Sequence, residues 1–177
     1  MKPFSRLLFA MLAATLLAHT PACQPKAAAP ITPATTAALP VLGKAPIWNL
    51  KDLGGREVSS AALKGKVVVV DFWATWCGPC VAEIPGYIEL QKKYGPDGLV
   101  IVGLSVDRKG PEHVKKFVTE NGMNYTVGMA DDAVQEAFGG FDAIPTTFLI
   151  DRDGNLRHNK VVMMPHAEYE ALVRQLL

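Results

Sequence analysis

An almost unbroken apolar run at residues 67–74 places the strongest constraint on the fold. Val67 to Ala74 is rich in β-branched side chains, and Asp71 is its only charged residue. β-Branched residues favour strands, and a strand without polar alternation is buried on both faces. Such a strand needs covering layers above and below it, so the run predicts the central strand of an α/β domain.

Strand and helix patterns alternate along the rest of the folded part. A short strand and turn are expected at residues 45–55, and longer strands at 99–106, 125–129, 146–150 and 156–163. Helices are expected at 81–94, 112–121, 133–138 and 166–177. This order predicts an α/β fold with a mixed central sheet and helices on both faces.

Length and charge exclude several classes of protein. The chain has 177 residues, 20% of them charged, with a net charge of +1, and its Lys and Arg residues are scattered instead of gathered in blocks. A nucleic-acid-binding surface needs such blocks, so no nucleic-acid partner is expected. Without its leader and tether the chain suits one globular domain, which we expect to be monomeric.

Residues 1–22 have the pattern of a secretory signal sequence. Lys2 and Arg6 precede an apolar stretch at residues 7–18, and Thr, Pro and Ala follow before Cys23. As a helix this stretch would rise only about 18 Å, short of the roughly 30 Å of a bilayer core, so a permanent transmembrane span is not expected. The pattern predicts an extracytoplasmic protein of the periplasm or cell envelope.

Cys23 occupies the place of the lipid-modified cysteine in a bacterial lipoprotein signal, with Ala22 before it. Thr20 stands where such signals usually carry an aliphatic residue, so lipidation, ordinary cleavage and retention of the segment as an anchor all stay open. Residues 23–44 consist largely of Ala, Pro and Thr, which bury too little apolar surface to offset their conformational entropy. We expect them to tether a folded domain at residues 45–177.

The segment Trp76-Cys77-Gly78-Pro79-Cys80 contains two cysteines separated by two residues. This spacing suits a redox disulfide and also half of a zinc site. Structural zinc needs four ligands, and the sequence has no second cysteine pair. We therefore expect no metal and no cofactor beyond the redox-active Cys77–Cys80 disulfide.

The position of the pair gives its two cysteines separate roles. Between a buried strand and the first turn of a helix, unpaired amide groups and the helix dipole stabilise an anion. Cys77 is therefore expected to be the nucleophilic thiolate. Cys80, one turn deeper, is expected to be the resolving thiol.

The segment from Val70 to Cys80, Val-Asp-Phe-Trp-Ala-Thr-Trp-Cys-Gly-Pro-Cys, resembles the active-site segment of thioredoxin. The added helix and strand at residues 112–129 and the Ala-Ile-Pro-Thr sequence at 143–146 resemble the extracytoplasmic thiol-disulfide oxidoreductases of the TlpA/ResA type, within the redoxin/thioredoxin superfamily. The resemblance covers residues 45–177. It implies a thioredoxin fold with an N-terminal strand and hairpin extension and a helix–strand insertion before a cis-proline.

The same resemblance implies where a substrate binds. It implies that Ile144–Pro145 is a cis peptide bond, which proline allows at a low cost, whereas the residues alone would favour an ordinary trans proline at the start of a strand. Pro145 would lie against the cysteine pair as part of the catalytic site, and the neighbouring backbone would receive an extended substrate segment. The expected substrate-binding residues are Trp76, Gly78, Pro79, Ile144 and Thr146.

Two carboxylates are candidates for moving the proton of Cys80. Asp71 interrupts an apolar strand, where burial favours the protonated carboxyl, and it matches the buried proton-transfer aspartate of thioredoxin. Many tethered relatives have Asn there, and Glu83 matches an active-site glutamate of those relatives. Glu83 also suits an exposed position in the first turns of a helix. The sequence does not choose between the two.

The resemblance implies an exported reductase of disulfides in envelope proteins, such as the cysteines of apocytochrome c or of copper sites. Cys77 would attack a substrate disulfide and Cys80 would resolve the mixed disulfide, while a membrane thiol-electron transporter would recharge the pair. Two alternatives stay open. One is a copper metallochaperone that binds with Cys77, Cys80 and His158 or His166, and the other is a thiol peroxidase.

Overall fold

The computed structural model describes residues 38–177. The predicted signal sequence (1–22), Cys23 and most of the expected tether lie outside the described residues. The strands are β1 (Gly43–Lys44), β2 (Asn49–Lys51), β3 (Glu57–Ser59), β4 (Val67–Trp73), β5 (Leu99–Ser105), β6 (Thr126–Met129), β7 (Thr146–Ile150) and β8 (Asn155–Val161). The helices are α1 (Gly78–Tyr94), α2 (Pro111–Glu120), α3 (Asp132–Ala137) and α4 (His166–Arg174).

Six of these strands form one sheet in the order β1-β8-β7-β4-β5-β6. β5 pairs in parallel with β4 and with β6, whereas β7 is antiparallel to both β4 and β8. The predicted mixed sheet is therefore confirmed. β4 is the central strand and is buried along its whole length, as its apolar sequence indicated.

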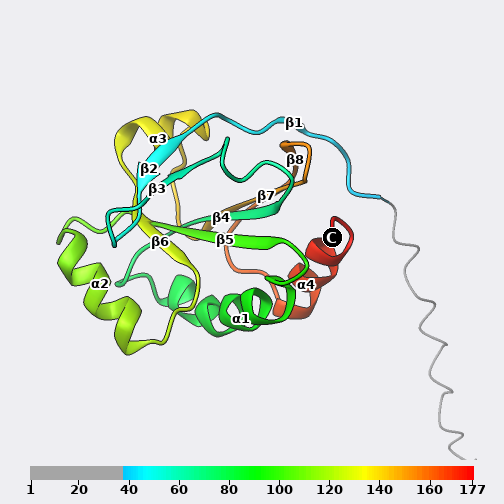
Figure 1. The fold of residues 1–177 in the computed structure, drawn as a ribbon. Helices are drawn as coiled ribbons and strands as arrows, with labels where there is room; N and C mark the ends of the chain where they lie inside the picture. The colour runs from blue at the N-terminus through cyan, green and yellow to red at the C-terminus, as the bar shows by residue number, and fades with distance from the viewer. Residues whose placement is uncertain (1–37) are drawn as a thin grey trace, which may run out of the picture. The chain divides into compact units, whose positions relative to one another are not determined.

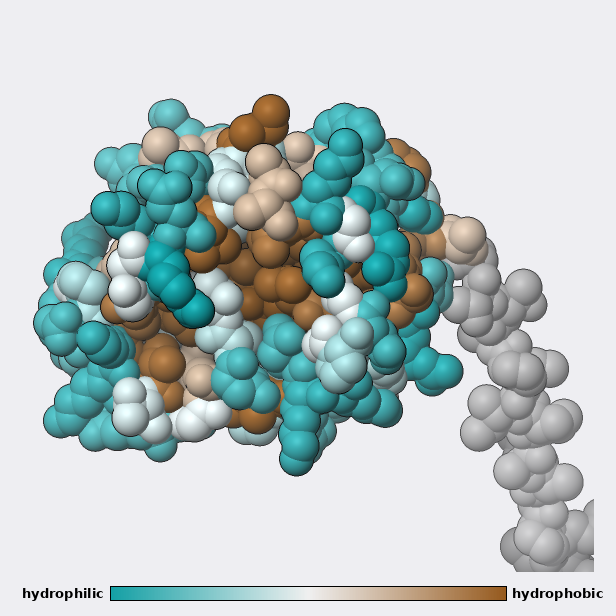
Figure 2. Space-filling view, in the orientation of Figure 1, coloured by the Kyte–Doolittle hydropathy of each residue, from teal (hydrophilic) through white to brown (hydrophobic). Residues whose placement is uncertain are grey.

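The sheet is covered on both faces, which gives the domain three layers. Figure 1 shows α1, α2 and α4 on one side of the sheet, and α3 with the β2–β3 hairpin on the other. Figure 2 shows apolar residues gathered in a recess on the visible face, with polar residues around it. The expected α/β fold, with its N-terminal strand and hairpin extension and with α2 and β6 inserted before the proline, is confirmed.

The side chains of β4 alternate between the two layers. Val68, Val70 and Phe72 pack with Phe138, at the end of α3. Val67 and Val69 pack against α1 and α4, and Trp73 packs with residues of α1 and α2. Because alternate residues of a strand point to the same face, Asp71 lies on the α1 side. This alternation directs the carboxyl of Asp71 towards the helix that carries the cysteine pair.

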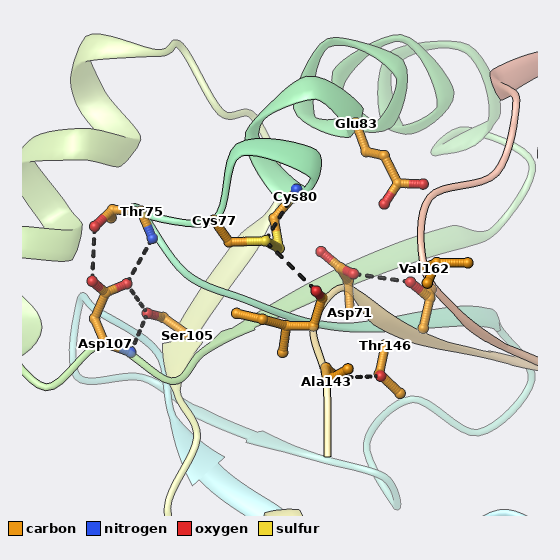
Figure 3. The surroundings of a disulfide bond; sticks show 12 residues. Asp71, Thr75, Cys77, Cys80, Glu83, Ser105, Asp107, Ala143, Thr146 and Val162 are labelled. Carbon is orange, nitrogen blue, oxygen red and sulfur yellow. Dashed lines mark hydrogen bonds between the residues drawn. A yellow bond between two sulfur atoms is a disulfide. The ribbon is translucent and has the colours of Figure 1, made fainter. Parts of the chain in front are cut away.

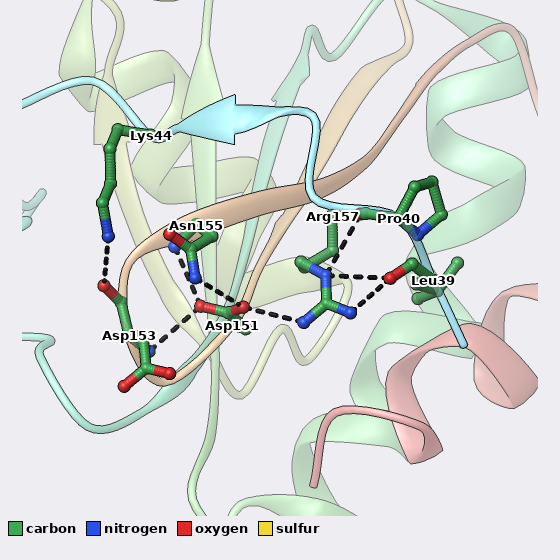
Figure 4. A network of polar contacts seen from close by, with 7 residues as sticks. All are labelled: Leu39, Pro40, Lys44, Asp151, Asp153, Asn155 and Arg157. Atoms are coloured by element: carbon green, nitrogen blue, oxygen red, sulfur yellow. Dashed lines mark hydrogen bonds and ion pairs between the residues drawn. The ribbon is translucent and has the colours of Figure 1, made fainter.

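The folded domain begins earlier than the predicted boundary between residues 44 and 45. β1 pairs with β8, and the backbone N–H of Leu42 donates to Leu156 O at 2.8 Å. Figure 4 shows the Arg157 side chain donating to the backbone carbonyls of Leu39 and Pro40, while its other branch contacts Asp151. The last residues of the expected tether therefore add an edge strand to the sheet.

Element bounds otherwise differ from the expected ranges mainly at their ends. β8 stops at Val161 instead of Met163, and α4 stops at Arg174 instead of Leu177. α1 already begins at Gly78, so it includes the second cysteine. Within residues 38–177, no helix combines the length and apolar character that crossing a bilayer requires.

Candidate active site

The cysteine pair lies where β4 gives way to α1. Cys77 and Cys80 form a disulfide with an S–S distance of 2.04 Å. Cys77 is the N-cap of α1, and its Sγ accepts a hydrogen bond from the backbone N–H of Cys80 at 3.3 Å. Pro79 suits the start of a helix, where its missing N–H costs nothing. A negative charge on Cys77 Sγ would therefore be stabilised by helix amides and the helix dipole.

Accessibility separates the two cysteines in the expected direction, although both are buried. Cys77 is 6% exposed and Cys80 is 2% exposed. Trp76 is 66% exposed and lines a cleft of about 450 Å³ together with Ile144. This cleft reaches the pair at Ile144, whose carbonyl oxygen lies 3.8 Å from Cys77 Sγ.

The Ile144–Pro145 peptide bond is cis, as expected. It faces the pair, because Cys77 Sγ lies 3.8 Å from Ile144 O. Val162 holds this segment from the far side, since its backbone N–H donates to Pro145 O at 3.0 Å. The Thr146 side chain is 2% exposed and donates to Ala143 O at 2.7 Å. The hydroxyl of Thr146 is therefore committed to the fold, and contact of its backbone with a substrate stays a prediction.

Among the other residues expected to bind substrate, Gly78 and Pro79 are exposed and Ile144 is half-buried. They lie around the disulfide with Trp76, so the structure brings them together on one surface. Figure 3 shows the Cys77–Cys80 bond at the start of the helix with Asp71 beside it. Their contact with a substrate stays a prediction.

Asp71 is 3% exposed and receives one hydrogen bond, from Thr147 Oγ1 to Oδ1 at 2.9 Å. Tyr87 in turn contacts Thr147, with 3.2 Å between their hydroxyl oxygens. Burial raises the pKa of Asp71 to about 7; the Thr147 hydrogen bond and Lys160 oppose the shift, and Glu83 adds to it. A carboxyl that titrates near neutrality is suited to exchanging a proton with a thiol.

Glu83 lies on α1, but it does not take the exposed position that the sequence allowed. Its side chain is 9% exposed, and Oε1 lies 2.6 Å from Lys160 Nζ. Oε1 also accepts the backbone N–H of Met164 at 3.2 Å, while Oε2 is buried without a protein partner among the described residues. Glu83 lines a cavity of about 230 Å³ between α1 and the segment before α4, large enough for water.

Sequence reasoning missed a second polar cluster, which fixes the loop before Cys77. Asp107 accepts the backbone N–H of Thr75 at 2.8 Å and the Thr75 hydroxyl at 2.7 Å. Ser105 donates to the same carboxylate at 2.8 Å, and His113 Nε2 lies 3.1 Å from Thr75 Oγ1. Neighbouring parallel strands end at the same sheet edge, so Asp107 just after β5 was a signal available in the sequence.

We expect Asp107→Asn to lower the free energy of unfolding by about 2 kcal/mol, because its amide would face a donor that now bonds to a carboxylate oxygen. Chemical denaturation of the oxidised protein measures the change. Asp142→Asn, at an exposed position of the same cleft, is the matched control and should change stability little. Equal effects of the two substitutions would contradict a special role of Asp107.

His158 and His166 are the two histidines named as copper ligands in the alternative function, and the structure shows what surrounds each of them. His166 Nε2 lies 3.6 Å from Glu89 Oε2 and 4.0 Å from Glu170 Oε2. His158 Nε2 is buried and has no hydrogen-bond partner in the described part of the chain. Over residues 38–177, the structure gathers no group of three or more His, Cys, Asp or Glu side chains suited to a metal ion.

A disulfide at a strand–helix junction that faces a cis-proline suits thiol–disulfide exchange, since Cys77 is at the helix N-cap and is the more exposed of the two cysteines. The sheet and helices around it form the thioredoxin fold. Fold and redox pair together are those of the thiol–disulfide oxidoreductases.

Comparison with known proteins agrees with this class. The thiol-disulfide oxidoreductase ResA of Bacillus thuringiensis (strain Al Hakam) is 40% identical over 118 residues, which cover 65% of this chain and 66% of the relative. The thioredoxin-like protein YneN of Bacillus subtilis (strain 168) is 30% identical over 128 residues, covering 72% and 75%. A crystal structure of a thiol:disulfide interchange protein from Chlorobium tepidum TLS matches with a TM-score of 0.71 at 35% identity, covering 76% of this chain and 95% of that one.

Residues 21–173 match the family model described as Redoxin. The chain belongs to the Redoxin family. It spans about two thirds of the length of its ResA relatives, 66% for the Bacillus thuringiensis protein.

Proposed function

We propose that this chain is an exported thiol–disulfide oxidoreductase that reduces disulfides of proteins in the cell envelope. The observation that carries the proposal is the Cys77–Cys80 disulfide, with Cys77 at the helix N-cap, Cys80 buried, and Asp71 near the pair (Figure 3). The names of the ResA and Chlorobium relatives, thiol-disulfide oxidoreductase and thiol:disulfide interchange protein, support the same chemistry.

In the reduced protein, the Cys77 thiolate attacks one sulfur of a substrate disulfide. A mixed disulfide forms, and the first substrate sulfur leaves as a thiolate. Cys80 then gives up its proton to a nearby carboxylate and attacks Cys77 Sγ, so the second substrate sulfur also leaves as a thiolate. The substrate has gained two electrons, and the protein holds the Cys77–Cys80 disulfide seen in the structure.

The reducing direction rests on the Gly-Pro dipeptide between the cysteines, which resembles the reductants of this fold. In an oxidising envelope such a protein needs a membrane thiol-electron transporter to return it to the dithiol form. The N-terminal segment, through a lipid on Cys23 or as a retained anchor, would keep the domain near that transporter. Cysteines of apocytochrome c or of copper sites are the client class that we propose.

A Cys80→Ser variant expressed with its own leader is expected to accumulate mixed disulfides with envelope proteins, because Cys77 attacks and nothing resolves the adduct. Non-reducing electrophoresis and mass spectrometry of the adducts identify the clients. A double variant, Cys77→Ser with Cys80→Ser, is the control for adducts through Cys23. Adducts that form through Cys80 in a Cys77→Ser variant would contradict the assigned roles, and tight Cu(I) binding without any dithiol exchange would favour copper delivery instead.

A further inference from the structure

Three neighbouring strands place a row of polar residues under α1. Asp71 on β4 lies opposite Thr147 on β7, and Thr147 lies opposite Lys160 on β8. Residues directly opposite each other in a sheet point to the same face. The row therefore ends in a lysine on the buried side of the sheet, where Lys160 is only 7% exposed. Lysine is rarely buried to this degree unless its charge is paired.

Lys160 is held by contacts from three elements. Its Nζ lies 2.6 Å from Glu83 Oε1 on α1 and 5.5 Å from the ring centre of Tyr169 on α4. Nζ also lies 3.5 Å from Val162 O, in the segment whose N–H holds Pro145. A buried ammonium needs partners of this kind, and its position is fixed by them. Lys160 thus connects the helix of the cysteines to the cis-proline segment.

The same lysine pairs with Glu83 and also acts electrostatically on Asp71, and these two carboxyl groups have different surroundings. Glu83 Oε1 contacts the Lys160 ammonium and accepts the backbone N–H of Met164. Within residues 38–177, Asp71 receives only the hydroxyl hydrogen bond from Thr147, and burial raises its pKa to about 7. Two nearby carboxylates oppose each other's ionisation, so Glu83, paired with Lys160, adds to the larger effect of burial on the pKa of Asp71.

We propose that Lys160 is a positioning residue of the redox site, which holds the Glu83 carboxylate in a buried ion pair and so leaves Asp71 as the carboxylate that accepts the proton of Cys80. The inference rests on the proposed function, in which Cys80 resolves the mixed disulfide. The Cys80 proton moves to Asp71, the Cys77–Cys80 bond forms, the bond between Cys77 and the substrate sulfur breaks, and a substrate thiolate leaves.

Other titratable groups around Asp71 do not compete for this proton. Tyr87 on α1, Tyr125 before β6 and Tyr169 on α4 feel its charge, and burial raises the pKa of each phenol. They therefore stay neutral at working pH. His158 on β8 is also affected by Lys160, since burial and the lysine charge lower the pKa of its imidazole. A His158→Gln variant separates its contribution from that of Asp71.

The test is the pH–rate profile for oxidation of the reduced full-length protein, carrying Cys23→Ser, by saturating hydroxyethyl disulfide between pH 5 and 9. The disulfide is kept saturating so that attack by Cys77 does not limit the rate of oxidation, and the measured rate then reports resolution by Cys80. Lys160→Met should move the inflection assigned to Asp71 upward by about one pH unit, because an opposite charge is removed and Glu83 stays unpaired. Lys160→Arg should restore the profile, and Lys116→Met, at an exposed position, should leave it unchanged.

Glu83→Gln should move the same inflection downward, and the Lys160→Met, Glu83→Gln double variant should return it close to the wild-type value. Asp71→Asn should remove it. An unchanged profile in Lys160→Met, or an inflection that survives Asp71→Asn and disappears in Glu83→Gln, would overturn the inference. If Lys160→Met does not fold, Glu83→Gln and the double variant test the inference instead, through the shifts of the inflection expected for them. Absence of disulfide reduction by the wild-type protein at every pH would instead reject the proposed function.

Discussion

Replacing Asp71 by Asn is expected to raise the free energy of unfolding by about 4 kcal/mol at pH 8 and to change it little at pH 3. The pKa of Asp71 rises from the ordinary 3.8 to about 7 in the folded protein, chiefly through burial. Each pKa unit corresponds to about 1.4 kcal/mol of differential stability. Asn keeps an oxygen that can accept the Thr147 hydrogen bond, so the substitution removes the charge and little else.

The sign of the effect follows from where the proton is bound. Between the unfolded and folded pKa values the folded carboxyl holds a proton that the unfolded one has lost. Wild-type stability therefore falls as the pH rises from about 4 to about 7 and then stays lower. Asn cannot ionise, so the variant should lose none of its stability over this interval on account of residue 71.

Denaturant titrations of the oxidised protein at pH 3, 5, 7 and 8 measure this difference. Asp142→Asn, an exposed aspartate, is the control and should follow the wild-type curve. A gain of equal size at pH 3 and pH 8 would show that charge is not the cause. The same Asp71→Asn variant should resolve mixed disulfides more slowly, so the buried acid is retained at a cost in stability.

Features formed by residues close together in the sequence could be predicted from it. The apolar run of β4, the cysteine pair after it and the helix that follows are contiguous, so their local pattern predicts the strand–helix junction. Asp71 was visible because it alone breaks that run. Pro145 is distant from the pair, and only the resemblance to thioredoxin-like proteins connected the two.

Features that depend on how distant strands and helices pack together could not be predicted from the sequence. Lys160 lies on β8, where a lysine would ordinarily face solvent, and its burial arises because α1 and α4 cover that side of the sheet. β1 was likewise hidden, because it is only two residues long, Gly43–Lys44, and the apolar residues just before it, Val41 and Leu42, stay exposed. Their place is decided by the free edge of β8 and by Arg157, which binds the Leu39 and Pro40 carbonyls.

The largest loss of activity is expected from Cys77→Ser, on the order of a thousandfold or more, since it removes the attacking sulfur. Cys80 cannot replace it, because it is only 2% exposed and lies behind Cys77. Cys77 also has the helix N-cap position and the hydrogen bond from Cys80 N–H that stabilise a thiolate. Cys80→Ser keeps these features, so it should lose resolution alone.

A single-turnover reaction with an aromatic disulfide separates the two cases, because release of the coloured thiol reports the first attack. Both variants should carry Cys23→Ser, since this third cysteine would otherwise react as well. Cys80→Ser should release one equivalent at nearly the wild-type rate and remain as the mixed disulfide, whereas Cys77→Ser should release almost none at neutral pH. Comparable rates in the two variants would show that Cys80 reaches the substrate directly, and the order of attack would then have to be reversed.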